Sequence, residues 1–575
     1  MKEEILKFFK GDADDSEATL VKYSHDASLL EVRPKIVLFP KDSEDVKNLV
    51  KWVGENKIKY PKLSITARCA GTDMSGGAIG ESIILDFTRY MNKLIGGPLP
   101  MKSKAEWEIA VQPGMFYRDF EKITLAKGLI LPCYTASKSL NALGGMYGNN
   151  SAGERTLKYG KMEDYILSAK VVFADGNEYV VKPLNQEALE KKIAQNDFEG
   201  NVYKNIFNLI KANEEEIKQA KPRVSKNSAG YYLWNVLRDN SRQSGASIFD
   251  LNKLLVGSQG TLGIVTEMTI KLIPENKYSK LVVIFTNDLE PLGRLVDEIL
   301  THHPESLETY DNKTMKLAVK FFPDFLKNKG LVGMIKFMWS FFPEFFMFLT
   351  GGIPKLIILA EFAGRDEKVV QDKCLQLVEK IKNFKLKVHI TESTAEANKY
   401  WDIRRESFAL LRKHVKDMRT APFIDDIIVR PEFLPKFLPE LNKIISKYDL
   451  ISTLAGHAGD GNFHVIPLMD FKRNDIAKIV TELGEQVYDL VIRYHGSITA
   501  EHNDGLIRTP YLEKMYGNRI TNIFKKIKEI FDPQNIFNPG KKVPATGEGI
   551  ISTQAGTKEY LASHIALEHQ AVHRV

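Results

Sequence analysis

The stretch RCAGTDMSGG, residues 68–77, decides the fold of the first half of the chain. Its glycines leave backbone amides bare, and with the hydroxyls of Thr72 and Ser75 they form a nest that suits a pyrophosphate. Two further glycine clusters follow, GGMYGNNSAG at 144–153 and GSQGTLGIV at 257–265. No Gly-Lys-Ser/Thr follows any of them, and none opens a strand–GxGxxG–helix unit with a downstream acid, which excludes Walker and Rossmann phosphate loops.

Short apolar runs and tight turns surround these clusters and predict strands. The pattern over 171–181 is typical of a hairpin. At 268–272, apolar and polar residues alternate, as in a half-buried strand that Pro274 ends. Beyond Pro274 the strand-like runs 281–286 and 356–362 alternate with helices. We therefore expect a domain boundary close to this proline.

Histidines and acids gather in two motifs of the second half. GHAGDGNFH contains His457 and His464, and ITAEHNDG contains Glu501 and His502. Two histidines and one carboxylate make a borderline ligand set for a divalent metal, with positions left open for substrate. His502 adjoins the carboxylate and is placed to act as a base while the metal holds the substrate.

Composition narrows the class of protein. The 575 residues are 43% hydrophobic and 27% charged, which predicts a soluble globular protein of two to four domains. The net charge of +7 comes without a dense Lys/Arg stripe, so nucleic-acid binding is not expected. Three scattered cysteines exclude a disulfide framework and an iron–sulfur cluster held by them alone. The N-terminus lacks the apolar run of a signal peptide, and we expect a cytoplasmic protein.

The glycine clusters, together with ILDFTR at 84–89 and VFADG at 172–176, resemble the FAD domain of the vanillyl-alcohol oxidase / p-cresol methylhydroxylase superfamily. The resemblance implies an α+β protein with a two-part FAD-binding domain over 32–276, preceded by an N-terminal helical segment, 1–31. FAD is expected to bind non-covalently, because the first loop holds Cys69 but no histidine. The flavin contacts that the resemblance implies are Arg68, Gly71, Thr72, Ser75, Gly76, Gly77, Gly144, Gly145, Asn149, Ser151, Ala152, Gly153, Gly257, Ser258, Gly260, Thr261, Ile264, Val265 and Asn538.

The histidine motifs are similar to those of one branch, the flavin-dependent D-2-hydroxyacid dehydrogenases, which have G-H-x-G-D-G-N-x-H and G-E-H-G. Ala500 and Asn503 replace the glycines of the second motif. The resemblance implies oxidation of a small, D-lactate-like 2-hydroxy acid to the 2-keto acid. It makes His457, His464 and Glu501 ligands of a divalent metal, with zinc expected first and manganese or iron as alternatives, and His502 the base.

Two residues are expected to orient the substrate. WDIR at 401–404 resembles the W-x-x-R of this branch and implies that Arg404 clamps the substrate carboxylate, a task suited to a planar bidentate donor. A surface arginine on a helix is the alternative. Asn462 is expected to assist Arg404.

The rest of the chain is assigned by the same resemblance. A cap domain with an antiparallel sheet is expected over 277–525, with an apolar insertion at 313–354. A C-terminal segment, 526–545, is expected to return to the FAD domain, and 546–575 is expected to be a disordered tail. Within the insertion, 331–353 has charges and a proline in its middle, which argues against a spanning helix. It is read as core, partner interface or membrane-surface contact.

Several alternatives stay open from the sequence. The substrate is D-lactate-like in the main reading and D-2-hydroxyglutarate in the nearest alternative. A flavin-binding electron-transfer subunit and an ether-lipid synthase-like transferase are weaker alternatives. The active site of such a transferase has consecutive histidines, whereas Glu501-His502-Asn503 has only one. Electrons are expected to pass to a separate acceptor, which is a quinone, an iron–sulfur protein or an electron-transfer protein. A peripheral position on the inner face of the membrane is the alternative to a cytoplasmic one.

Overall fold

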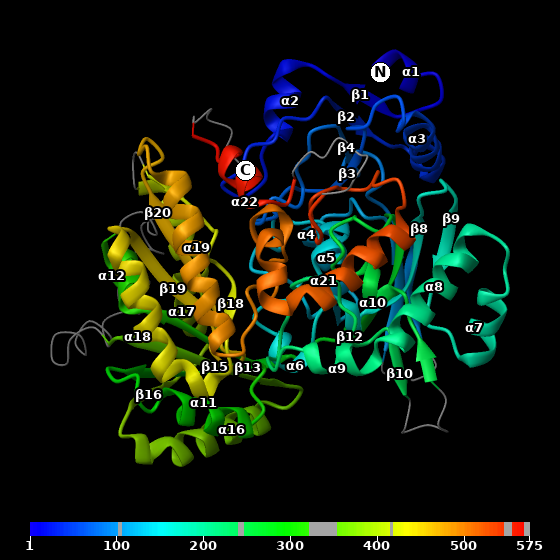
Figure 1. Cartoon of the computed structure of the whole chain (residues 1–575). Coiled ribbons are helices and arrows are strands. Elements are labelled where there is room, and N and C mark those ends of the chain that lie inside the picture. Colours follow the sequence, from blue (N-terminus) through cyan, green and yellow to red (C-terminus); the bar gives the residue numbers. More distant parts are fainter. Residues whose placement is uncertain (102–105, 240–246, 321–353, 415–417, 546–554, 568–575) are drawn as a thin grey trace.

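The computed structural model describes residues 1–575 except 102–105, 240–246, 321–353, 415–417, 546–554 and 568–575. Three main sheets with helices around them, and a two-stranded ribbon of β10 (Leu237–Asp239) and β11 (Ser247–Phe249), organise this part of the chain. Figure 1 shows a small sheet at the top, a six-stranded sheet below it on the right, and a cap sheet with its helices on the left. The predicted α+β class and the antiparallel cap sheet are confirmed.

The small sheet is mixed and carries the first glycine loop. Its strands β2, β4 and β3 pair in parallel, and β1 pairs antiparallel to β2. Helix α3 (Ser43–Asn56) begins where the Asp42 side chain accepts a hydrogen bond from the amide of Asp45, and its apolar stripe packs on the sheet. The loop 68–77 leaves the carboxyl end of β3. The strands are β1 (Asp12–Asp14), β2 (Ile36–Phe39), β4 (Ile83–Asp86) and β3 (Ile65–Arg68).

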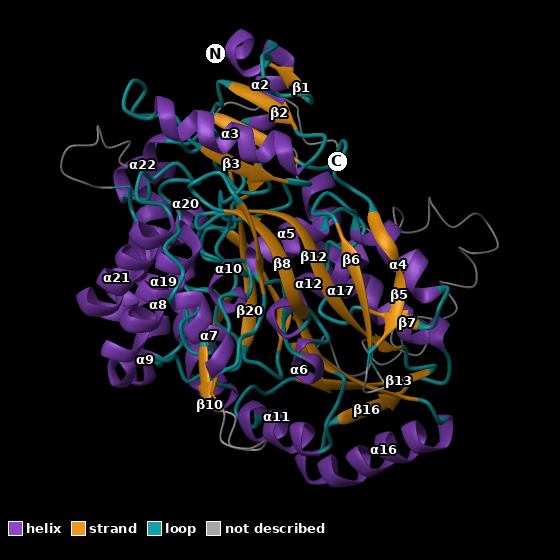
Figure 2. Cartoon of the chain, turned by 90° about the vertical axis from the view of Figure 1, so that its right-hand side faces the viewer, coloured by secondary structure: helices purple, strands orange, loops and turns teal. Residues whose placement is uncertain are grey.

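The six-stranded sheet is antiparallel and holds the larger core of the first half. Alternate residues of its central strand are buried, which confirms the strand predicted at 268–272, and the predicted hairpin forms with Val171 opposite Tyr179. Helices α5 (Leu143–Asn149) and α8 (Phe198–Ala212) contribute to its core. Figure 2 shows its long strands in the middle of the molecule. They are β5 (Leu94–Pro100), β6 (Trp107–Val111), β12 (Ile264–Pro274), β8 (Ile166–Val172), β9 (Glu178–Val181) and β7 (Leu129–Ile130).

The cap sheet is antiparallel and is covered on both faces. Val282 and Ile284 of its strand β13 belong to one apolar core, whereas Val283 and Phe285 belong to another, which explains the continuous apolar run at 281–286. Helices on the first face are α11 (Leu292–Thr301), α16 (Glu367–Lys380), α18 (Leu434–Ile445) and α19 (Ile476–Arg493), and on the second α12 (Asn312–Lys320) and α17 (Thr394–His414). The strands are β16 (Lys387–Ile390), β13 (Tyr278–Thr286), β15 (Leu356–Gly364), β14 (Ser306–Asp311), β19 (Ile451–His457), β20 (Asn462–Met469), β17 (Arg419–Thr420) and β18 (Ile427–Ile428).

The chain returns to the first half through one long helix, α21 (Leu512–Phe531). Its residues Ile520, Phe524 and Ile527 join the core of the six-stranded sheet, so the return begins before residue 526, earlier than expected. In the last turn of α21, the ammonium group of Lys528 donates to the carbonyls of Thr261 and Phe537. These contacts tie the segment after α21 to the third glycine loop.

The expected disordered tail is wrong for residues 555–567. Helix α22 (Lys558–Ser563) forms there, and Tyr560 and Leu561 are buried. The Tyr560 hydroxyl donates to Glu81 over 2.8 Å, and Ile565 forms a β-bridge with Leu30. The apolar segment 331–353 lies outside the described residues. Among the helices that are described, none combines the length and the apolar character that a membrane span needs.

Candidate active site

One cavity of about 430 Å³ joins the glycine loops of the first half to the histidine motifs of the cap. Its walls come from the loops after β3, around α5 and before β12, and from α17, β19, β20 and the loop that carries Glu501 and His502. The fold therefore brings together the two groups of motifs that the sequence singles out.

Most of the expected flavin contacts line this cavity. They come from all three glycine clusters. Those that line it are Arg68, Gly71, Thr72, Gly77, Gly144, Gly145, Asn149, Ser151, Ala152, Gly153, Ser258, Gly260 and Val265. Those that do not are Ser75, Gly76, Gly257, Thr261, Ile264 and Asn538.

Asn538 stands behind the cavity wall instead of facing it. Its amide donates to the carbonyls of Gly77 and Gln259, and its oxygen accepts from the Thr66 hydroxyl. Asn538 is fully buried and holds the first and third glycine loops together. Within the first loop, the carboxylate of Asp73 accepts the backbone amides of Ser75 and Gly77, at 3.0 and 2.6 Å.

The three expected metal ligands converge at the other end of the cavity. His457 Nε2 lies 3.1 Å from Glu501 Oε1, His464 Nε2 lies 3.3 Å from the same oxygen, and the two ring nitrogens lie 3.3 Å apart. Ligands that share one zinc ion at about 2.0–2.1 Å are separated by about 3.3 Å in tetrahedral geometry. The three atoms thus have the spacing of a shared ion.

A carboxylate behind each imidazole fixes its orientation. His457 Nδ1 lies 2.5 Å from Glu308. Thr309 of β14 pairs with Gly456 of β19, and the same register places the neighbouring residues Glu308 and His457 opposite each other. His464 Nδ1 lies 3.2 Å from Asp425. Such carboxylate–histidine pairs turn the second ring nitrogen towards a metal and raise its basicity.

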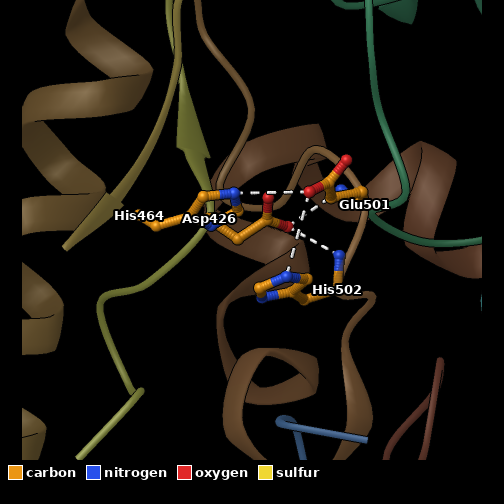
Figure 3. Close-up of side chains that lie close together, drawn as sticks. All are labelled: Asp426, His464, Glu501 and His502. Carbon is orange, nitrogen blue, oxygen red and sulfur yellow. Dashed lines mark hydrogen bonds and ion pairs between the residues drawn. The ribbon is translucent and has the colours of Figure 1, made fainter. Parts of the chain in front are cut away.

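Asp426 belongs to this cluster in space but acts as a clamp for the loop. Its Oδ2 accepts the Thr499 hydroxyl and the amides of Ala500, Glu501 and His502, all within 2.6–2.9 Å. Figure 3 shows the carboxylate joined to the backbone at Glu501 and His502. Although it lies near enough to share an ion with His464, Glu501 and His502, its oxygens already have these partners. We assign Asp426 to the loop rather than to the ligand set.

His502 lines the cavity next to the ligand set. Its Nδ1 lies 2.6 Å from Asp425 Oδ2, and its Nε2 lies 3.9 Å from Glu501. Its ring stacks on that of His464 at 4.9 Å. Asp425 therefore orients both imidazoles, one in the ligand set and one beside it.

The two residues expected to orient substrate have different positions. Arg404 lines the cavity and is buried, and it donates from Nε to Glu308 over 2.9 Å. Asn462 does not line the cavity. Its amide donates to Asp426 and to the carbonyl of Ile427, so the expectation that it contacts substrate is not met.

The charges of the centre do not balance when its histidines are neutral. Among the described residues around the histidines, five buried carboxylates lie close to three buried cationic side chains, so two negative charges have no compensating positive charge. They are Glu308, Asp425, Asp426, Asp460 and Glu501, and Lys226, Arg404 and Arg508. Asp504 pairs with Lys542 and does not alter the difference.

This imbalance appears in the pKa values of the site. Burial opposes charge on His464, but Asp425 and Glu501 raise its pKa to about 10. Burial likewise opposes charge on His502, whose pKa is nevertheless raised by Asp425 and Asp426. Burial would raise the pKa of Glu308, but His457 and Arg404 lower it to about 2. The pocket thus attracts positive charge, as protons or as a cation.

Four charged residues around the histidines were not predicted from the sequence. They are Glu308, Asp425, Asp426 and Lys226. Lys226 comes from the first half, is buried, and lies 3.1 Å from Asp460 and 3.4 Å from Glu501. The adjacent acids Asp425 and Asp426 stand between apolar residues, and such a pattern indicates buried carboxylates with partners. Neither Glu308 nor Lys226 has a local signal of this kind.

Comparison with known families and proteins agrees with this geometry. Residues 34–182 match the FAD binding domain family, and 275–542 match the family of FAD linked oxidases, C-terminal domain. A D-2-hydroxyglutarate dehydrogenase of Pseudomonas putida is 27% identical over 93% of this chain but only 50% of its own length. The chain spans about half the length of the first curated relatives that it matches.

Two relatives are matched over most of their length. A glycolate oxidase subunit of Bacillus subtilis is 26% identical over 92% of this chain and 93% of its own. A D-lactate dehydrogenase of Anaerostipes hadrus is 27% identical over 90% and 92%. Among solved structures, p-cresol methylhydroxylase with substrate bound has a TM-score of 0.64 at 14% identity and covers 94% of this chain and 96% of its own. At that identity the likeness establishes the fold alone.

Proposed function

We propose that the chain, whose residues 34–182 match the FAD binding domain family and whose residues 275–542 match the family of FAD linked oxidases, C-terminal domain, oxidises a D-2-hydroxy acid of the D-lactate class to the 2-keto acid. The observation that carries the proposal is the meeting of His457, His464, Glu501 and His502 in the cavity that the flavin loops line. The names of the relatives, D-lactate and D-2-hydroxyglutarate dehydrogenases among them, support the substrate class and the D configuration of its α-carbon.

The residues present fit FAD. Three glycine clusters line one side of the cavity, and Gly145 keeps free space where a side chain would project. Burial raises the pKa of Cys69, so its thiol stays protonated, which favours non-covalent binding. When bound, FAD supplies the acceptor for the hydride that leaves the α-carbon.

The residues also fit a divalent cation. Two imidazole nitrogens and one carboxylate oxygen have the spacing of a shared ion, and two uncompensated negative charges surround them. His457, His464 and Glu501 would hold it, with zinc favoured by the donor set and manganese or iron as alternatives. When bound, the cation supplies positive charge that acidifies a substrate hydroxyl.

The chain's own groups move the proton and orient the acid. Asp425 holds Nδ1 of His502, which leaves Nε2 to accept the hydroxyl proton of the substrate. Arg404 presents its guanidinium to the cavity and would bind the α-carboxylate, while Glu308 fixes the position of Arg404. Glu308 also contacts His457, so one carboxylate positions both a ligand and the clamp.

The electrons would leave to an acceptor outside these 575 residues. Cys69 lies at the flavin loop, Cys133 in the core of the first half and Cys374 in the cap, so they cannot share one cluster. A quinone, an iron–sulfur protein or an electron-transfer protein would serve, with 331–353 as a candidate contact for a partner or a membrane surface.

The test is the anaerobic flavin spectrum of the purified holoenzyme before and after addition of D-lactate, D-2-hydroxyglutarate and their L-enantiomers. We expect D-lactate to bleach the oxidised band and L-lactate to leave it, with about one divalent ion per flavin by mass spectrometry. A spectrum that none of these acids bleaches, in protein that carries FAD and metal, would overturn the proposed substrate class.

A further inference from the structure

A salt bridge spans the two halves of the protein at the wall of the cavity. Glu154 directly follows the second glycine cluster, and Arg405 follows Arg404 on α17 of the cap. Arg405 Nη2 lies 2.5 Å and Nε 3.2 Å from the two carboxylate oxygens of Glu154. Glu154 accepts a further hydrogen bond from Tyr134 over 3.1 Å, and the guanidinium of Arg405 stacks on Trp401. Both charged residues line the cavity.

This pair determines which charges a substrate meets beyond its α-carboxylate. Among the described residues, and apart from the histidines of the metal and base sites, the basic side chains that line the cavity are Arg68, Arg404 and Arg405. Arg68 is engaged at the first glycine loop, where it donates to the carbonyls of His25 and Ala78. Arg404 is assigned to the α-carboxylate. Arg405 is thus the group for a second carboxylate, and Glu154 already occupies its bidentate face.

A second carboxylate of the substrate would have to displace Glu154 from Arg405, although Glu154 is 9% exposed and is held by both Arg405 and Tyr134. The displaced Glu154 carboxylate would then lie, without its cation, next to the carboxylate of the substrate. Two like charges placed next to each other repel, and the repulsion weakens binding of the dicarboxylic acid. We propose that Glu154 is a specificity-determining residue that excludes dicarboxylic 2-hydroxy acids and selects monocarboxylic ones. The inference rests on the proposed function and names its substrate class more narrowly.

The test compares acids that differ in the distal carboxylate. Binding of pyruvate and of 2-oxoglutarate to the holoenzyme is measured from the perturbation of the flavin spectrum, and flavin reduction is measured with D-lactate and D-2-hydroxyglutarate. In Glu154→Gln, we expect the preference for the dicarboxylic over the monocarboxylic acid to rise about tenfold or more in both measurements. Removing Arg405 as well, in Glu154→Gln/Arg405→Gln, should cancel that gain.

Glu121→Gln is the matched control, because Glu121 pairs with Lys138 and does not line the cavity. Glu154→Ala replaces the Gln variant if the latter loses its flavin. An unchanged preference in a variant whose flavin is still reduced overturns the inference alone, as does a wild-type preference for the dicarboxylic acid. If no acid binds or reduces the flavin in any variant, the proposed function fails and the inference with it.

Discussion

Replacing Asp426 by alanine should loosen the loop that carries both a metal ligand and the base. The Asp426 carboxylate is fully buried and accepts from the amides of Glu501 and His502 at 2.8 and 2.7 Å. It also accepts from Thr499 and Ala500, although the amide of Ala500 has a second acceptor in the carbonyl of Asp426. Alanine leaves the first two amides and the Thr499 hydroxyl without this partner.

The magnitude follows from these hydrogen bonds. A buried donor left without an acceptor costs about 1–3 kcal/mol, so the two amides alone account for about 2–6 kcal/mol. Domains of this kind have about 5–15 kcal/mol of stability, and the variant should fold but unfold at much lower denaturant. The Glu501 carboxylate would lose its fixed place, and the protein should retain less metal.

Urea denaturation of the holoenzyme, with and without prior removal of divalent ions by a chelator, separates the two roles open to Asp426. A clamp destabilises the variant by a similar amount in both preparations, because its hydrogen bonds do not depend on the ion. A metal ligand would matter only in the ion-loaded protein. The control is Asp372→Asn, since Asp372 is exposed on α16 and its change should stay within about 0.5 kcal/mol. Equal stability of wild type and variant after chelation would refute the clamp.

Two further variants test the base and a buried acid. His502→Gln should lower the rate of flavin reduction, measured by stopped-flow, by about 10²–10⁴-fold at unchanged FAD content. His389→Gln is the control, because His389 pairs with Glu396 outside the site. A near-wild-type rate in His502→Gln would remove His502 from the mechanism. Burial, and then Asp73, raise the pKa of Asp26 to about 7. The fold therefore favours the protonated acid, and this contribution to stability is complete below about pH 4 and is lost as the pH rises through about 7. Denaturation from pH 5 to 8 should show a steeper decline for wild type than for Asp26→Asn, and parallel slopes would contradict the assignment.

Local periodicity allowed much of the fold to be predicted. The alternation at 268–272 and the hairpin over 171–181 are set by neighbours in sequence, so their strands appear where expected. The order of residues 555–567 could not be anticipated in that way. Their stability comes from Glu81, from Leu30 and from Glu485, which pairs with Lys558, and these partners lie far away along the chain.

The site residues could be predicted where they belong to one short sequence motif. His457 and His464 share one hairpin, and glycines flank them, so their convergence could be expected. Asn462 belongs to the same motif, yet its amide turns to Asp426 instead of the cavity. Glu308 looks like any acid in a strand, and only the register of β14 on β19 gives it the imidazole of His457 as a partner.

The loop with Glu501 and His502 belongs to the cap and is also held by the first half. Ser228 donates from its amide to the carbonyl of Thr499 and from its hydroxyl to that of Ala500. A few residues on, the amide of Leu506 donates to the carbonyl of Ser75 in the first glycine loop. The position of the base is therefore set from both sides, by these contacts with the first half and by Asp425 and Asp426 of the cap. Separating the halves would remove the contacts of Ser228 with this loop and leave only those of the cap, so the arrangement of Glu501 and His502 relative to the flavin loops depends on contact between the halves.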